Sequence, residues 1–311
     1  MNSPVAIGID LGGTRVRAAL VTREGLILDR VEQPTRASHG QQSIIEQIVN
    51  LARGIVKRAD PPSVAGLGIC SPGPLDTDAG MVLSAPTIKG FTDFPLREEL
   101  QSRLPWPVYL ENDGIAATLG EWRFGAGRSV DHMVYITVST GIGGGAVVDG
   151  NLLRGRRGMA GHIGHMVIAM DGRPCPCGNR GCWEASASGT ALSKMALENG
   201  FADGIQVFNE ARDGNEAALQ LVAFLSRQLG VGMVNLAHIF SPKKIVMGGG
   251  VSNALDLLEP GIRHHIEKNA MPPFRTITLE KAQLGDNSGV IGMAELVFSA
   301  NTFSVHMEAS E

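Results

Sequence analysis

Apolar runs and glycine-rich turns alternate along the first part of the chain. Residues 5–10 form an apolar run that a glycine turn joins to a second run at 15–21, and this pattern predicts a pair of hairpin strands. At 43–59 the apolar residues recur at helical spacing instead. Two further apolar runs lie at 64–70 and 108–112. Strands that alternate with helices in this way predict an α/β sheet.

The middle of the chain repeats the form of its opening. From Val134, an apolar run, a turn of Ser, Thr and Gly, and a second apolar run follow one another. Few residues are identical in the two segments, but the shared form indicates two related halves. Residues 215–239 predict a long buried helix or a helix pair. With 311 residues, of which 43% are hydrophobic, the chain is long enough for two domains.

Charge and cysteine content exclude several classes of protein. The net charge of −4 offers no basic face for nucleic acid, and the one basic cluster, 154–158, is typical of a solvated loop. We see no signal peptide and no apolar run long enough to predict a membrane span. Because three of the four cysteines cluster and the fourth, Cys70, lies in an apolar run, we expect a reduced, cytoplasmic protein.

Three glycine turns at strand ends predict phosphate binding. In the first, Gly12 and Gly13 let the backbone approach an anion closely, and Thr14 adds a hydroxyl donor. Asp10 repels phosphate, so its place beside the turn favours a Mg²⁺ ion between the two, bound directly or through water. A second turn, at 139–145, repeats the device. Together the two turns could clamp a nucleotide's phosphates in an interdomain cleft.

The third turn consists of Gly248, Gly249 and Gly250, between an apolar strand and a helix. This place suits the close approach of a nucleotide's sugar and base. A plain glycine hairpin would explain any one of the turns, but three of them at strand ends favour a nucleotide site.

Asn112 and Asp113 stand where an apolar strand ends and a helix begins. Both residue types are ordinary helix caps, and capping alone would explain them. An ionised Asp113 within reach of a substrate hydroxyl could instead take its proton while the hydroxyl attacks a γ-phosphate. Asn112 could then hold a neighbouring hydroxyl with a donor and an acceptor.

A compact set of metal ligands lies in one loop and comprises His165, Cys175, Cys177 and Cys182. One nitrogen and three sulfurs fill the tetrahedral shell of a structural zinc and leave no open position for catalysis. His162 would be a fifth ligand, and we do not expect it to bind the metal. Glu184 follows Cys182 closely, so the metal would hold its carboxylate where sugar hydroxyls can donate to it. The loop therefore predicts a sugar pocket.

These motifs together resemble the bacterial sugar kinases of the ROK family (repressor, open reading frame, kinase). The matching segments, in the family's order, are DLGGT, END, STGIGGG, GNLLRGRRGMAGHIGH, CPCGNRGCWE and VMGGGVS. They run from residue 10 to residue 252, and the combination is far more specific than any single motif.

The resemblance implies an α/β, actin-like (ribonuclease H-like) ATPase fold, with two α/β domains around a nucleotide cleft and a zinc-bound loop. It implies an ATP-dependent hexose kinase that acts at the 6-hydroxyl, with glucose as the first choice of substrate. The implied cofactors are ATP, Mg²⁺ and a structural Zn²⁺. Because members are commonly homodimers or homotetramers, we expect one of these assemblies.

The resemblance also assigns roles to individual residues. Asp113 is the catalytic base. The implied substrate contacts are Asn112, Asp113, His162, His165, Glu184 and, in the segment SPGP, Gly73. The implied nucleotide contacts are Asp10, Gly12, Gly13, Thr14, Thr140, Gly141, Gly143 and Gly144, together with the third glycine turn.

His162 departs from the family's pattern. The family usually has AGExGH, and this chain has AGHIGH, so His162 stands where a sugar-binding glutamate is expected. A neutral histidine offers one donor and one acceptor, whereas a carboxylate only accepts. The difference bears on substrate identity more than on kinase chemistry, and N-acetylmannosamine and N-acetylglucosamine stay open as substrates.

Two other functions and a different phosphoryl donor stay open at this point. A sugar-sensing repressor of this family carries an N-terminal helix-turn-helix domain, and with DLGGT beginning at residue 10 we expect none here. A non-catalytic sugar binder is disfavoured by the intact Asp113 and phosphate turns. Polyphosphate could replace ATP as the donor.

The division into domains is expected to be discontinuous. We predict that residues 1–117 and about 290–311 form the smaller α/β domain. The larger α/β domain then takes residues 118–289, including the zinc loop at 161–184.

Overall fold

The computed structural model of the chain describes residues 3–88 and 90–308. By contacts the chain divides into two compact units. Unit 1 runs to Arg128, takes in Arg154–Ala160 and resumes at Asp286, and unit 2 consists of Ser129–Leu153 and Gly161–Gly285. This division differs from the predicted one mainly at Arg154–Ala160 and at the helix that follows Asp113, both of which lie in unit 1.

Unit 1 is built on a five-stranded sheet with the order β3-β2-β1-β4-β8. Its strands are β1 (Val5–Leu11), β2 (Arg15–Thr22), β3 (Ile27–Pro34), β4 (Val64–Ser71) and β8 (Val108–Asn112). The first three strands are antiparallel neighbours, and β4 pairs in parallel with β1 and β8. A small antiparallel sheet adds β5 (Leu75–Asp76), β6 (Met81–Ser84) and β7 (Thr92–Phe94).

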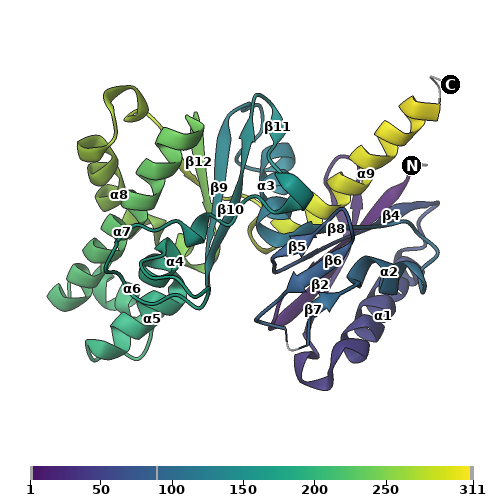
Figure 1. The fold of residues 1–311 in the computed structure, drawn as a ribbon, viewed down its shortest axis with the longest axis horizontal. Coiled ribbons are helices and arrows are strands. Elements are labelled where there is room, and N and C mark those ends of the chain that lie inside the picture. The colour runs from purple at the N-terminus through teal and green to yellow at the C-terminus, as the bar shows by residue number, and fades with distance from the viewer. Residues whose placement is uncertain (1–2, 89, 309–311) are drawn as a thin grey trace. The chain divides into compact units, whose positions relative to one another are not determined.

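Helices cover both faces of this sheet (Figure 1). The helices of unit 1 are α1 (Gln41–Ala59), α2 (Leu96–Gln101), α3 (Asp113–Phe124) and α9 (Ser288–Glu308). Side chains alternate across a strand, so Ile7 and Ile9 join the core that includes α1, while Gly8 faces α9. The α1 core also takes in the apolar residues of β4 and α2.

Glycine lets α9 pack directly against the backbone of its neighbours. A Cβ on Gly8 would lie 1.9 Å from the carbonyl oxygen of Val290, and one on Gly68 would lie 2.4 Å from that of Met293. A Cβ on Gly292 would lie 1.8 Å from the Ala116 oxygen. No real Cβ fits at these distances, so the glycines are needed for space, and they draw α9 onto β1, β4 and α3.

Unit 2 has its own five-stranded sheet, in the order β11-β10-β9-β12-β13. The strands are β9 (Met133–Val138), β10 (Ile142–Val148), β11 (Asn151–Leu152), β12 (Lys244–Gly248) and β13 (Thr278–Lys281). The repeat of form seen in the sequence is present. In each sheet the first strand in sequence pairs antiparallel with the next strand and in parallel with a later one.

The helices of unit 2 gather around its longest helix, α7 (Figure 1). They are α4 (Trp183–Ala187), α5 (Gly189–Glu198), α6 (Gly204–Arg212), α7 (Glu216–Phe240) and α8 (Leu255–Asn269). Trp183 is fully buried against α7, where its ring takes the space above Gly232 and its Nε1 donates to the Gln228 carbonyl (2.9 Å). Short 3₁₀ helices occur in both units, at Ala37–His39, Arg156–Gly158, Ile163–His165, Gly250–Ala254, Pro272–Phe274 and Gly285–Asn287.

Among the described helices, α7 alone has the length and apolar composition that a membrane span would need. Half of its most apolar stretch is buried inside the structure. The same residues, among them Leu225, Leu229 and Met233, belong to the core of unit 2, which accounts for the apolar composition.

The packing of α9 generates a test. Gly292→Ala is expected to lower the free energy of unfolding by about 2 kcal/mol, because its methyl group needs the space of the Ala116 oxygen. Gly54→Ala is the matched control, since Gly54 is also helical and its Cβ would meet only the Arg58 guanidinium, at 3.7 Å. It should gain about 0.5–1 kcal/mol from helix propensity. Urea denaturation followed by circular dichroism measures both, and equal stabilities of the two variants would contradict this account.

Candidate active site

The first glycine turn joins β1 to β2 in unit 1. The N–H of Gly12 donates to the Arg15 carbonyl (2.9 Å) and closes the hairpin. Gly13 has no room for a side chain, because a Cβ there would lie 2.5 Å from the Thr87 oxygen. Thr35 holds the turn from outside through hydrogen bonds to two of its carbonyl oxygens. The predicted turn is therefore present, and the space available at Gly13 requires a glycine there.

Asp10 lies at the end of β1 and faces Arg17 on β2. The two residues are direct cross-strand partners, and Arg17 Nη1 lies 3.2 Å from Asp10 Oδ2. Burial raises the pKa of Asp10, and the Arg17 guanidinium acts in the opposite direction. Arg17 also pairs with Glu32 on β3 (3.1 Å). The sequence analysis missed Arg17, although the alternation of Arg15, Val16 and Arg17 places both arginines on one face of a strand.

Asn112 and Asp113 occupy the junction of β8 and α3, as predicted. Asn112 is the N-cap: its Oδ1 accepts from the N–H groups of Gly114 (2.9 Å) and Ile115 (3.3 Å). The amide oxygen of Asn112 is therefore already engaged in capping. A Cβ on Gly73 would lie 3.4 Å from Asn112 Nδ2, so the structure brings the predicted substrate residue Gly73 beside the amide nitrogen.

Asp113 combines access to solvent with a raised pKa. Loss of hydration, first, and the Asp10 carboxylate, second, raise the pKa of Asp113 to about 6, and a hydrogen bond from the Gly114 N–H opposes them. The side chain still reaches the surface of unit 1, as a group that meets substrate must. A carboxyl group with this pKa is mostly ionised at neutral pH and accepts a proton readily, which suits a general base.

Glu111 lies just before this pair and is buried. Its Oε2 accepts from Arg154 Nε (2.6 Å) and its Oε1 from the Asn112 N–H (2.9 Å). Arg154 begins the segment Arg154–Ala160, which belongs to unit 1 although unit 2 flanks it on both sides in sequence. The segment predicted to be a solvated loop is therefore held in place by this contact. Its Arg154 is explained because the buried Glu111 carboxylate needs a cation beside it.

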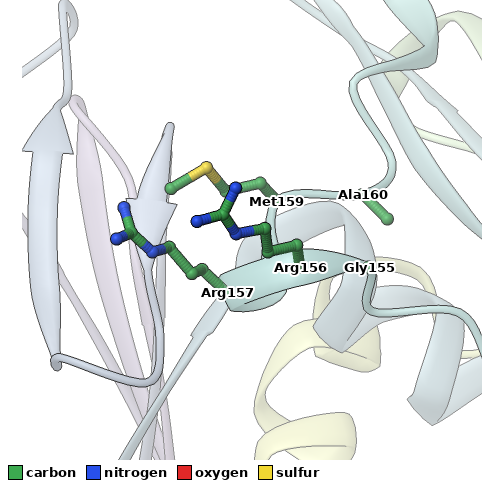
Figure 2. A pocket seen from close by; sticks show the side chains of 5 residues that line it. All are labelled: Gly155, Arg156, Arg157, Met159 and Ala160. Atoms are coloured by element: carbon green, nitrogen blue, oxygen red, sulfur yellow. The ribbon is translucent and has the colours of Figure 1, made fainter.

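A cavity of about 380 Å³ lies along the same segment. Its lining residues are Gly155, Arg156, Arg157, Met159 and Ala160, and Figure 2 shows the two guanidinium groups with the Met159 side chain near them. Arg157 is a non-glycine residue with a positive φ of 59°, and its Nε lies 3.4 Å from Asp76 Oδ2. This ion pair gives Arg157 a structural role in unit 1.

The second glycine turn joins β9 to β10 in unit 2. Glu184 Oε2 accepts from the Ile142 N–H (2.8 Å), and a Cβ on Gly141 would lie 2.3 Å from that same oxygen. Gly144 is also needed for space, since its Cβ would lie 2.1 Å from the Tyr135 oxygen. A Cβ on Gly143 would meet only an ordinary contact at 3.5 Å. Glu184, predicted to contact sugar, thus has one carboxylate oxygen on the turn predicted to hold phosphate.

The third turn lies beside the second. A Cβ on Gly249, which has φ of 81°, would lie 2.4 Å from the carbonyl oxygen of Val138, where β9 ends. Gly248 has equally little room, whereas Gly250 faces open space within 4 Å. The Ser252 hydroxyl donates to the Gly249 oxygen (2.7 Å). Unit 2 therefore brings the second and third turns together.

The four predicted metal ligands converge. The ligand atoms of His165, Cys175, Cys177 and Cys182 all lie within 4.8 Å of one another. His165 Nδ1 lies 3.7 Å from the Cys175 sulfur, and the Cys177 and Cys182 sulfurs are 3.7 Å apart. Ligands on a tetrahedral shell with bonds of about 2.3 Å are about 3.8 Å apart, so the set fits zinc.

His162 lies outside this cluster, as predicted. Its ring centroid is 6.3 Å from that of His165. Burial, first, and the neighbouring His165, second, lower the pKa of His162, which favours a neutral imidazole at neutral pH. The side chain is half-buried, so it can still present a donor and an acceptor to a ligand.

Comparison with known proteins identifies the family. The family model described as "ROK family" matches residues 6–300. The glucokinase of Thermotoga maritima is 36% identical over 94% of this chain and 96% of its own length. The chain belongs to the ROK family.

Solved ROK structures are also similar to the chain. The ROK hexokinase from Thermus thermophilus matches with a TM-score of 0.84 and 33% identity, over 96% of this chain and 99% of its own. A ROK family glucokinase from Streptomyces griseus, in complex with glucose and AMPPNP, matches with a TM-score of 0.80 and 34% identity, over 94% and 98%. The chain therefore has the ROK sugar kinase fold, in agreement with its two five-stranded sheets and the helices packed on them.

Proposed function

We propose that this ROK protein is an ATP-dependent hexose kinase that phosphorylates glucose at its 6-hydroxyl, with Asp113 as general base. The observation that carries the proposal is the Asp113 carboxyl, which is accessible to solvent and has a pKa of about 6. Asp113 lies where β8 ends and α3 begins. The relatives named glucokinase, and the solved relative that holds glucose and AMPPNP, support the choice of substrate and donor.

Asp113 would take the proton of the 6-hydroxyl while that oxygen attacks the γ-phosphorus of ATP. The bond to the oxygen bridging the β- and γ-phosphates breaks, and ADP leaves with that electron pair. Backbone N–H groups of the glycine turns would stabilise the charge on the phosphates. Mg²⁺ bound with the nucleotide would neutralise part of that charge, and Asp10 is the carboxylate beside the first turn that could hold it, directly or through water.

The sugar would be oriented by side chains that hydrogen bonds within the protein already hold in place. The Asn112 side-chain oxygen accepts the two hydrogen bonds that cap α3, so its amide nitrogen is the group that we assign to a sugar hydroxyl. One carboxylate oxygen of Glu184 accepts from the Ile142 N–H, and we assign the other oxygen to sugar hydroxyls. His162 and His165 are the further side chains that we assign to sugar contacts.

A structural zinc would occupy the cluster of one histidine and three cysteines. All four ligands of a tetrahedral shell are supplied by protein, so the zinc would activate no water. It would fix the loop that ends in Glu184. The antiparallel and parallel strand pairing repeated in both units supports the finer assignment of an actin-like fold.

Removing the base tests the central step. Asp113→Asn is expected to lower kcat about 10²- to 10⁴-fold, because the amide cannot take the hydroxyl proton. For the wild type, kcat/KM should rise with pH up to about 6 and then level off, since the base must be ionised. The control is Asp93→Asn, at a left-handed position that asparagine tolerates. A coupled assay for ADP measures all three, and Asp113→Asn with a tenth or more of the wild-type kcat would exclude this role.

The metal cluster is tested by composition rather than activity. Cys177→Ala is expected to lose most of the zinc, because a three-ligand remnant holds the ion far less tightly. Arg180→Ala, an exposed change on the same loop, should keep the wild-type content of about one zinc per chain. Inductively coupled plasma mass spectrometry after gel filtration gives the ratio. Wild-type zinc content in Cys177→Ala would contradict the assignment.

Position 162 is expected to set sugar preference. His162→Glu should change the ratios of kcat/KM among glucose, mannose, fructose, N-acetylglucosamine and N-acetylmannosamine by about fivefold or more, because a carboxylate only accepts hydrogen bonds. His162→Gln keeps a donor and an acceptor and should stay closer to the wild-type order. If His162→Glu leaves every ratio unchanged, the residue has no part in sugar choice.

A further inference from the structure

Thr35 holds the first glycine turn by its carbonyl oxygens. Its Oγ1 donates to the Gly12 oxygen (2.7 Å), and its N–H donates to the Thr14 oxygen (2.9 Å). In a trans peptide the C=O and the following N–H point in opposite directions. By fixing the Gly12 carbonyl on one side, Thr35 therefore directs the Gly13 N–H to the other side.

Thr190 does the same for the second turn, from the first turn of α5. Its Oγ1 (2.8 Å) and its N–H (3.3 Å) both donate to the Thr140 oxygen, which directs the Gly141 N–H away from α5. The Gly189 N–H donates to the Ser139 oxygen (2.7 Å) and so directs the Thr140 N–H in the same sense. These N–H groups of α5 are among the donors that every helix start leaves without a partner inside the helix.

The N–H groups directed in this way are free to bind an anion. Within the part of the chain that the structure describes, the N–H groups of Gly13, Thr140 and Gly141 donate to no protein acceptor. Each belongs to a turn that the proposed function assigns to nucleotide phosphates. An amide donor held in direction before the ligand arrives loses less freedom on binding than one on a mobile loop.

We propose that Thr35 and Thr190 are positioning residues for the nucleotide's phosphates. Neither touches the ligand; each acts through the carbonyl oxygens of one phosphate turn. The inference rests on the proposed function, since it requires that the turns bind ATP. It adds two residues that lie outside the glycine motifs, 23 and 50 positions in sequence from the carbonyls that their hydroxyls hold.

Removal of each hydroxyl tests the proposal. Thr35→Val and Thr190→Val keep the side-chain shape and lose one hydrogen bond each. The dissociation constant of Mg·AMPPNP, measured by titration calorimetry without sugar, should rise about threefold to tenfold in each variant. In steady state the KM for ATP should rise by a similar factor, while the KM for glucose stays within about twofold of wild type because no sugar contact is changed.

Conservative and matched variants separate positioning from loss of structure. Thr35→Ser and Thr190→Ser keep the hydroxyl and should restore wild-type nucleotide affinity. Thr22→Val is the control for a threonine hydroxyl in another turn, where Oγ1 accepts from the Glu24 N–H (3.3 Å). It should leave nucleotide affinity unchanged.

The outcomes distinguish this inference from the proposed function. If the wild type binds no Mg·AMPPNP, the turns do not serve nucleotide phosphates, and the proposed function and the inference both fall. If the wild type binds it and the valine variants bind it equally well, only the inference is overturned. The inference is also overturned if the serine variants are as weak as the valine variants, or if the KM values for ATP and glucose rise together.

Discussion

Close approach of backbone to backbone is the constraint on which this structure depends. In unit 1, β1, β4, α3 and α9 each contain a glycine with no space for a side chain, because a carbonyl oxygen lies where the Cβ atom would be; these glycines are Gly8, Gly68, Gly120 and Gly292. In unit 2 backbone carbonyl oxygens lie equally close to Gly144, in β10, and to Gly249, in the third turn, whereas the atom close to Gly141 is a carboxylate oxygen of Glu184. A backbone that is bare of side chains exposes N–H groups as donors, and these are what an anionic ligand needs.

The chemistry of the candidate site depends on which of its polar groups already make hydrogen bonds within the protein. Asn112 uses its oxygen on the start of α3, and Glu184 uses one oxygen on the second turn. Both side chains are thereby fixed in direction. Asp113 remains accessible, with its pKa raised toward neutrality by its surroundings. An ionisable carboxyl beside the fixed Asn112 side chain, at the start of α3, is suited to proton transfer.

Much of the fold and of the candidate site was predictable because it depends on local patterns of residue type and spacing. The two hairpins, the helix at 43–59, the metal ligands and the Asn112–Asp113 junction follow from periodicity and spacing. What could not be predicted depends on contacts distant in sequence. Arg154 reaches Glu111 across 43 positions, and Glu184 reaches Ile142 across 42. No local pattern marks such partners, and the return of residues 154–160 to unit 1 was missed for that reason.

The central claim is that this ROK protein transfers the γ-phosphoryl group of ATP to glucose. Phosphorus NMR of the purified protein with Mg·ATP and glucose tests it most directly, because the product itself is seen. The account predicts that the γ-phosphate signal gives way to ADP and to a phosphate monoester whose splitting shows the two protons at position 6 of the sugar. Release of inorganic phosphate alone, or no consumption of ATP by folded protein, would contradict it.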